Sequence, residues 1–172
     1  MNVLGRLRVV LLEEGEPLAA TLSAAPPDAI AEVGSLAASG PRAAADPAEY
    51  DLLVEAIYEG YLLHYAQPRL IETADQNFAL LAGDRLYALG LERLVAIGDL
   101  DAVRELADVI TLCALLHARG DGASCEALWV AGARAVGFGA SPEHDRVKLL
   151  LRAGDPAATA ALSALNGPHA LA

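Results

Sequence analysis

Residues 46–66 read DPAEYDLLVEAIYEGYLLHYA, and this stretch decides the fold class. It begins with a helix start signal, because Asp46 can cap and Pro47 suits the first helical position. Glu49 stands where a capping box needs a glutamate. Nearly every following residue is apolar, which is typical of a helix in a core. The stretch therefore predicts an apolar helix over 47–65.

The rest of the chain also predicts helices. Apolar residues make up 55% of the 172 residues, much of that Ala and Leu, and aromatic residues only 5%. Runs of Val, Ile and Thr are few, so strands are not indicated. Capping residues, Gly and Pro place further helices over these ranges: 3–24 (two helices with a break), 28–38, 75–97, 101–118, 122–136, 142–153 and 156–165.

We therefore expect an all-α bundle of about eight helices. A single helical domain should span 1–172, with peripheral N-terminal helices over 1–45 and a tail over 166–172. The central bundle should consist of the helices near 47–65, 75–97, 101–118 and 122–136.

Charge and cysteine content limit the function classes. The formal net charge is −11, and a phosphate backbone would repel such a surface, so we expect no nucleic-acid partner. No run of 18 apolar residues predicts an integral membrane segment, and the N-terminus lacks a secretory signal, so we expect a cytoplasmic protein. Cys113 and Cys125 are expected to be buried thiols in a reducing compartment. No cofactor or metal is expected.

Three acidic residues share one face of the helix over 47–65. Asp51, Glu55 and Glu59 lie at i, i+4 and i+8. Di-iron bundles combine such glutamates with a Glu-x-x-His pair on two helices, and this sequence has no such pair. His64 lies five residues from Glu59, on another face. We therefore expect a partly exposed acidic stripe and no metal ligands.

Two further polar residues stand in apolar surroundings. His64 ends the apolar helix and is expected to be a core or capping residue, because the sequence nominates no Ser or Cys partner for nucleophilic catalysis. Asp84 follows Gly83 in LLAGDRLYALGLERL. Gly83 is expected to allow close helix packing, and Asp84 to pair with Arg85 or Arg93 or to cap a kink. No catalytic residue is predicted.

Two segments resemble the trans-isoprenyl diphosphate synthases. Residues 54–64, VEAIYEGYLLH, resemble the family's helix VELIHTASLIH, and residues 80–86, LLAGDRL, resemble the LAGDxL that opens its next long helix. Residues 94–110, LVAIGDLDAVRELADVI, also resemble the family's sequence in the segment that follows LAGDxL. The resemblance covers residues 40–120 and implies the N-terminal half of the isoprenoid synthase fold.

The chain departs from this family at the metal-binding motif. Active members continue directly into DDxxD, whose aspartates hold Mg²⁺ against a diphosphate leaving group. Residues 65–69 read YAQPR instead, and no second DDxxD follows. The chain thus resembles the small, non-catalytic subunit of heterodimeric long-chain polyprenyl diphosphate synthases. That subunit pairs with a catalytic one and helps set product length, in a supply route for menaquinone side chains.

The resemblance implies partners and places for them. The partner would be a catalytic prenyl synthase subunit or a second copy, and an isoprenoid or lipid is a possible ligand. The ligand-cavity candidates are Glu55, Tyr58, His64 and Asp84. The interface candidates, on a helix whose apolar residues spread over more than one face, are Phe78, Tyr87, Leu91 and Leu94. The alternatives are a stand-alone lipid-binding protein, a helical adaptor, and an enzyme with unrecognised chemistry.

Overall fold

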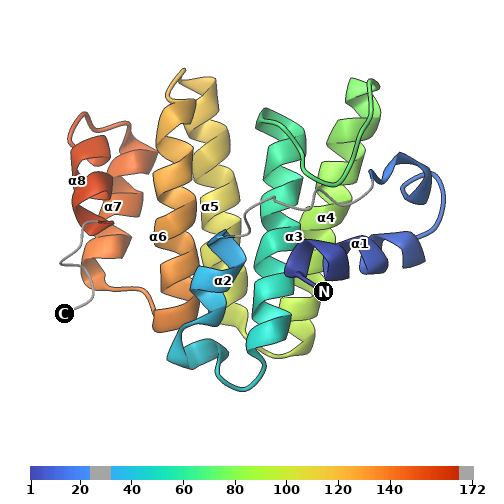
Figure 1. The fold of residues 1–172 in the computed structure, drawn as a ribbon. Helices are drawn as coiled ribbons and strands as arrows, with labels where there is room; N and C mark the ends of the chain where they lie inside the picture. Colours follow the sequence, from blue (N-terminus) through green and yellow to red (C-terminus); the bar gives the residue numbers. More distant parts are fainter. Residues whose placement is uncertain (24–31, 167–172) are drawn as a thin grey trace.

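The computed structural model describes residues 1–23 and 32–166, and this part of the chain is all-α, which confirms the predicted class (Figure 1). The only β feature in the described residues is an isolated antiparallel bridge between Leu22 and Ile71. The α-helices are α1 (Val3–Glu13), α2 (Glu32–Ala38), α3 (Pro47–Tyr65), α4 (Gln76–Ala96), α5 (Leu100–Ala118), α6 (Cys125–Phe138), α7 (Pro142–Ala153) and α8 (Ala158–Leu165).

The four long helices α3 to α6 stand side by side, as predicted for the central bundle (Figure 1). Helices α3 and α4 form one antiparallel pair, and α5 and α6 form a second. Helix α2 packs against both α3 and α6, and α1 packs against α3. Helices α7 and α8 cover the outer side of the second pair (Figure 1).

Acidic caps fix where the long helices begin. The Asp46 carboxylate accepts the Glu49 N–H at 3.1 Å at the start of α3. Asp75 and Asp99 cap α4 and α5 in the same way. The Glu49 side chain does not close the predicted capping box, because it forms an ion pair with Arg93 of α4 at 2.7 Å. The caps therefore confirm the predicted helix starts, while Glu49 links two helices.

Several predicted boundaries differ in detail. The second short helix expected before residue 24 is only a 3₁₀ turn over Ala19–Thr21. The range 122–136 divides into a 3₁₀ turn over Gly122–Ser124 and α6, which runs on to Phe138. The start of the helix predicted over 28–38 and residues 167–172 of the predicted tail lie outside the described residues.

Glycines set the distance between α3 and α4. A Cβ atom on Gly83 would overlap with the His64 imidazole and lie 3.0 Å from the Gly60 carbonyl oxygen. A Cβ atom on Gly90 would overlap with the Ile57 side chain. No side chain fits between the helices at these points, so the prediction that Gly83 allows close packing is confirmed.

The buried apolar residues form two clusters on opposite sides of α3. The larger one joins helices α2 to α8, with Leu94 as the member from α4, around Trp129, which has no exposed surface. The smaller one joins α1, α3, α4 and the segment after α3, around Leu7 and Leu86. Because both clusters use α3, this helix is covered on nearly all sides.

None of the described helices combines the length and the apolar character that crossing a membrane requires.

Candidate functional site

Two of the three acidic residues that share one face of α3 are completely buried. Glu55 and Glu59 have no exposed surface, whereas Asp51 is half-buried. The expectation of a partly exposed acidic stripe is therefore wrong for these two glutamates. The reason is that α2 and the segment after α3 cover this face, as hydrogen bonds from Gly34 and Leu70 to the carboxylates show.

Arg69 supplies the counter-charge for both buried glutamates. Its Nη2 lies 2.8 Å from Glu55 Oε2, and its Nε lies 2.9 Å from Glu59 Oε2. Backbone N–H groups complete the arrangement. Those of Arg69 and Leu70 donate to Glu59 Oε1 at 2.6 and 2.8 Å, and that of Gly34 donates to Glu55 Oε1 at 2.7 Å. Arg69, the last residue of YAQPR, thus completes a buried cluster of ion pairs.

Burial dominates the electrostatics of this cluster. Burial raises the pKa of Glu55, although Arg69 and the Gly34 N–H act in the opposite direction. Burial also disfavours the charged form of Arg69, but the two carboxylates hold the pKa of its guanidinium above the usual value. One guanidinium faces two carboxylates here, so the negative charge of Glu55 is only partly compensated, while Arg69 stays charged. The Arg69 guanidinium also lies over the Tyr58 ring, 5.1 Å from its centroid.

His64 and Asp84 form a contact between α3 and α4. His64 Nε2 lies 3.2 Å from Asp84 Oδ1, and the His64 ring stacks on Tyr87 with 5.2 Å between centroids. The expectation that Asp84 pairs with Arg85 or Arg93 is wrong. Arg85 instead pairs with Glu14 at 2.5 Å, and Arg93 pairs with Glu49. The reason is the direction of each side chain, since Asp84 faces the end of α3 and Arg85 faces the end of α1.

The ligand-cavity candidates do not line one cavity. Glu55 is taken up by Arg69, and the exposed Asp84 pairs with His64 between α3 and α4. Tyr58 lines a hollow of about 410 Å³ between α2, α3 and α6, and the other three candidates do not line this hollow. The other residues of its wall that the structure describes are Glu32, Val33, Leu36, Glu126, Trp129 and Val130.

Aromatic rings gather where α3 meets α4, α5 and α6, a feature that the sequence analysis missed. The Tyr65 ring stacks on His117 with 4.2 Å between centroids, and the Tyr61 hydroxyl lies 3.1 Å from His117 Nε2. Tyr61 also contacts Tyr58 and Trp129. The spacing of the tyrosines at 58, 61 and 65 is helical, and this signal could have placed them on one face.

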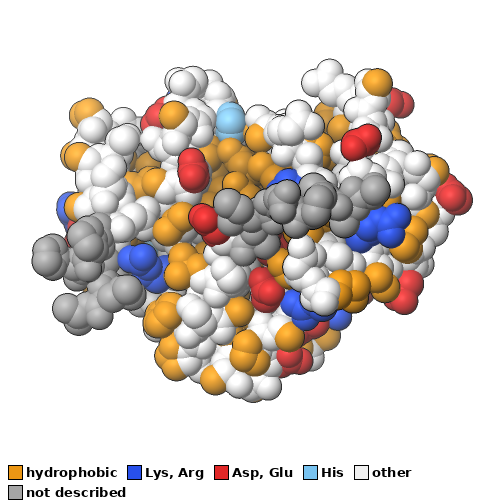
Figure 2. Space-filling model, viewed as in Figure 1, with side chains coloured by type: hydrophobic (Ala, Val, Ile, Leu, Met, Phe, Trp, Pro, Cys, Tyr) orange, Lys and Arg blue, Asp and Glu red, His pale blue; other side chains and the backbone are white. Residues whose placement is uncertain are grey.

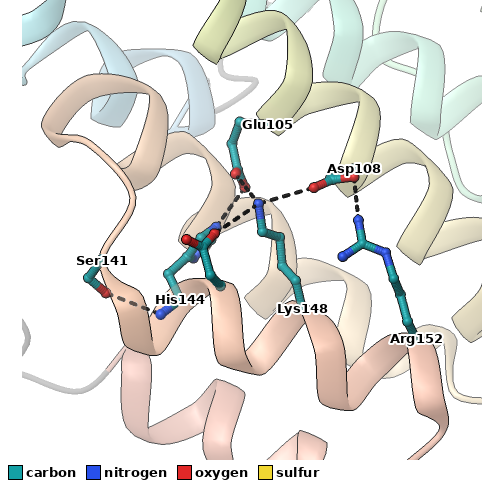
Figure 3. Close-up of polar contacts among 7 residues, drawn as sticks. Glu105, Asp108, Ser141, His144, Lys148 and Arg152 are labelled. Atoms are coloured by element: carbon teal, nitrogen blue, oxygen red, sulfur yellow. Dashed lines mark hydrogen bonds and ion pairs between the residues drawn. The ribbon is translucent and has the colours of Figure 1, made fainter.

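A second buried ion-pair network joins α5 to α7 (Figure 3). Glu105 accepts from Lys148 at 2.7 Å and lies 2.7 Å from His144 Nε2. Lys148 also pairs with Asp108, which in turn pairs with Arg152 (Figure 3). The sequence analysis missed this network. In the sequence, the basic residues of α7 recur every four residues, at 144, 148 and 152, and the two acids of α5 are three residues apart, at 105 and 108. This helical spacing could have indicated the network.

Asp99 connects the start of α5 to two other elements. Its carboxylate accepts from the Ala102 N–H at 3.0 Å and from the Tyr50 hydroxyl at 2.7 Å, and it pairs with Arg42 at 2.8 Å. Burial alone would raise the pKa of Asp99, but these hydrogen bonds and the arginine lower it. Burial and the hydrogen bond to Asp99 raise the pKa of Tyr50 to about 12.

The interface candidates on α4 differ in how far they are covered. Leu94 has no exposed surface, and Phe78, Tyr87 and Leu91 are half-buried against the two clusters. The exposed apolar residues of α4 are others, with Leu81 67% and Val95 53% exposed. An interface at α4 stays a prediction, and the large apolar side chains of this helix that are more than half exposed are Leu81 and Val95.

The described residues contain no group of three His, Cys, Asp or Glu side chains that could hold a metal ion. On the drawn face, acidic side chains are spread among apolar patches (Figure 2).

Comparisons with known proteins give no family for this chain. No protein-family model matches it, and neither a curated protein nor a solved structure matches it. The resemblance to prenyl synthases therefore stays a prediction that rests on the segments quoted above.

Proposed function

We propose that the chain is a non-catalytic, prenyl-synthase-like subunit that pairs with a catalytic polyprenyl diphosphate synthase. The proposal joins the resemblance over residues 40–120 to one observation, the ion pairs of Arg69. This residue stands at the end of YAQPR, where active relatives have the last aspartate of DDxxD. Its guanidinium pairs with Glu55 and Glu59, the two buried acids nearest to that place.

The charge at this place opposes metal-dependent ionisation. A Mg²⁺ ion needs oxygen ligands that are free to turn toward it. The oxygens of Glu59 already accept two backbone N–H groups and the Arg69 side chain, and those of Glu55 accept the Gly34 N–H and pair with Arg69. A fixed guanidinium also repels a divalent cation. In this proposal the α3–α4 pair keeps a structural role, and the partner supplies the chemistry.

The first test is prenyl transfer by the chain alone. We expect no product above a no-protein control when the purified chain is incubated with an allylic diphosphate, isopentenyl diphosphate and Mg²⁺. Product that depends on this chain would contradict a non-catalytic role.

The second test is pairing. The tagged chain is purified from its native cell, and we expect a prenyl synthase with both DDxxD motifs to accompany it. The two purified subunits are then mixed and followed by light scattering coupled to size exclusion, and product length is compared with and without this chain. A chain that stays monomeric at micromolar concentration in the presence of that synthase, and leaves product length unchanged, would refute the proposal.

Matched variants locate the contact. Leu81→Glu and Val95→Glu place charges on the exposed face of α4, and each should weaken pairing without loss of helicity. Leu149→Glu is the control, because Leu149 is a comparably exposed leucine, at 63%, on α7. The half-buried Tyr87 and Leu91 are less suitable, since a charge there would also disturb the core. Equal pairing by Leu81→Glu, Val95→Glu and Leu149→Glu would exclude α4 as the interface.

The hollow beside Tyr58 favours a second candidate function, the binding of an isoprenoid or another lipid. Its volume of about 410 Å³ and its wall of Val33, Leu36 and Trp129 suit an apolar chain. Glu32 and Glu126 also line it, so a neutral isoprenoid should bind better than a diphosphate ester.

Fluorescence separates the two functions. Trp129 is the only tryptophan in the sequence, so its emission reports on this hollow. Saturable quenching or a spectral shift with farnesol, and none with farnesyl diphosphate, would support lipid binding. No change with either compound would exclude this candidate and leave the subunit proposal untouched.

A further inference from the structure

The two cysteines of the chain meet at the junction of α5 and α6. Cys113 lies near the end of α5 and Cys125 is the first residue of α6, and both are free thiols without exposed surface. The Cys125 thiol donates to the Cys113 carbonyl oxygen at 3.8 Å. Two cysteines distant in sequence are thus neighbours in the fold.

A line of polar groups leads from Cys125 to the surface. The Tyr61 hydroxyl contributes to the lowered pKa of the Cys125 thiol and lies 3.1 Å from His117 Nε2. The Tyr65 ring stacks on the His117 ring, and 40% of Tyr65 is exposed. The Tyr61 hydroxyl therefore connects the surroundings of Cys125 with a half-buried imidazole.

The two thiols are chemically unequal. Cys125 begins a 14-residue helix, and a helix N-terminus favours a thiolate. Hydrogen bonds from the Cys113 thiol and the Tyr61 hydroxyl lower the pKa of Cys125 despite its burial. The hydrogen bond to Cys125, together with burial, raises the pKa of Cys113. One thiol is prepared to attack, and the other holds its proton.

We propose that Cys113 and Cys125 are a modification site at which a small two-electron oxidant, such as hydrogen peroxide, forms a disulfide bond. The Cys125 thiolate attacks one peroxide oxygen, the O–O bond breaks, and the departing hydroxide takes a proton to become water. Cys125 is then a sulfenic acid. The Cys113 sulfur attacks it, the S–O bond breaks, and the hydroxyl group leaves as water with the Cys113 proton.

The fold limits what this reaction requires. The Cys125 sulfur already lies 3.8 Å from the Cys113 carbonyl oxygen, so the disulfide requires a local rearrangement in which the two side chains turn toward each other. The product joins the end of α5 to the start of α6 beneath the aromatic cluster. The disulfide uses none of the charged residues, Glu55, Glu59 and Arg69, whose ion pairs support the proposed function, so either proposal can fail alone.

The test follows both thiols in the full, reduced chain. After exposure to hydrogen peroxide without denaturant, free thiols are alkylated with iodoacetamide and the intact mass is measured. We expect both thiols to disappear together with loss of two hydrogen atoms, and dithiothreitol to restore them. Persistence of two alkylatable thiols, or disulfide-linked dimers as the only product, would overturn the proposal.

Single substitutions assign the roles. Cys113→Ser should stop at the sulfenic acid of Cys125, which dimedone traps. Cys125→Ser should react more slowly than the wild-type chain by a factor of about ten or more, because its remaining thiol is protonated. Tyr61→Phe keeps the ring but removes the hydroxyl group, so the oxidation rate should fall at neutral pH and its pH profile should move to higher pH. Dimedone on Cys113 instead of Cys125 would refute this assignment.

A denaturant control covers the case in which a serine variant fails to fold. Circular dichroism checks the helicity of each variant, and the wild-type chain is oxidised in parallel with and without urea. The proposal requires that the intramolecular disulfide form faster in the folded chain than in the unfolded one. The opposite order would show that the fold keeps the two thiols apart, and would overturn it.

Discussion

Substitution of Arg69 should destabilise the chain more than loss of any exposed arginine. In Arg69→Met the apolar side chain keeps much of the packing, but Glu55 and Glu59 lose their counter-ion at positions with no exposed surface. Removing one partner of a buried ion pair costs about 3–5 kcal/mol. The remaining backbone N–H donors still hold both carboxylates, so we expect a loss at the lower end, about 3 kcal/mol.

The assay is urea unfolding followed by helical circular dichroism at neutral pH, with the midpoint and slope giving the free energy of unfolding. Arg104→Met is the matched control, because Arg104 pairs with Asp101 at 3.0 Å but is 75% exposed. Such a pair contributes less than about 1 kcal/mol. The two variants remove the same group, so burial alone distinguishes them.

A third variant identifies the cause. Adding Glu55→Gln and Glu59→Gln to Arg69→Met removes the charges while the amide oxygens can still accept the backbone N–H groups. Most of the lost stability should return. The reasoning is refuted if Arg69→Met matches Arg104→Met, or if the triple variant is no more stable than Arg69→Met.

Gly83→Ala should lower the melting temperature, because its Cβ atom would overlap with His64, whereas Gly5→Ala should be neutral or stabilising because only flexible terminal side chains are near. Asp99 has a lowered pKa in the folded chain, so its stabilisation is complete above the unfolded value of 3.8 and is lost as pH falls through the folded value. Asp99→Asn should therefore reduce stability at pH 7 and flatten the acid limb of a pH-dependent urea series; an unchanged limb would contradict this sign. Lys148→Met should cost about 3 kcal/mol in urea unfolding, since it leaves Glu105 buried without its cation, and a loss below about 1 kcal/mol would show that the network contributes little.

Helix positions followed from local chemistry, which the sequence displays directly. Asp46, Asp75 and Asp99 each precede an apolar periodic run, and each caps a helix in the structure. These interactions span two or three residues, so they do not depend on the rest of the fold. The same holds for Gly83, whose cost in a helix implies a packing reason.

The candidate site depended on contacts that no local pattern contains. The sequence predicts partly exposed Glu55 and Glu59, because charged residues are rarely buried without partners. Their partner Arg69 lies beyond the helix, in a segment whose path the sequence does not specify. His144 and Glu105 lie 39 residues apart and meet only because α7 packs against α5. Such pairs follow from topology, which helix periodicity leaves open.

The position of Arg69 also bears on the order in which the chain folds. Glu59 and Arg69 are ten residues apart, so the loop that joins them closes at a small cost in conformational entropy. Helix α3 cannot enter the apolar core ahead of this arginine without desolvating two unpaired carboxylates. We therefore expect docking of the segment after α3 to accompany or precede burial of the helix, so that the local contact of Glu59 with Arg69 forms before α2 and α4 close over it.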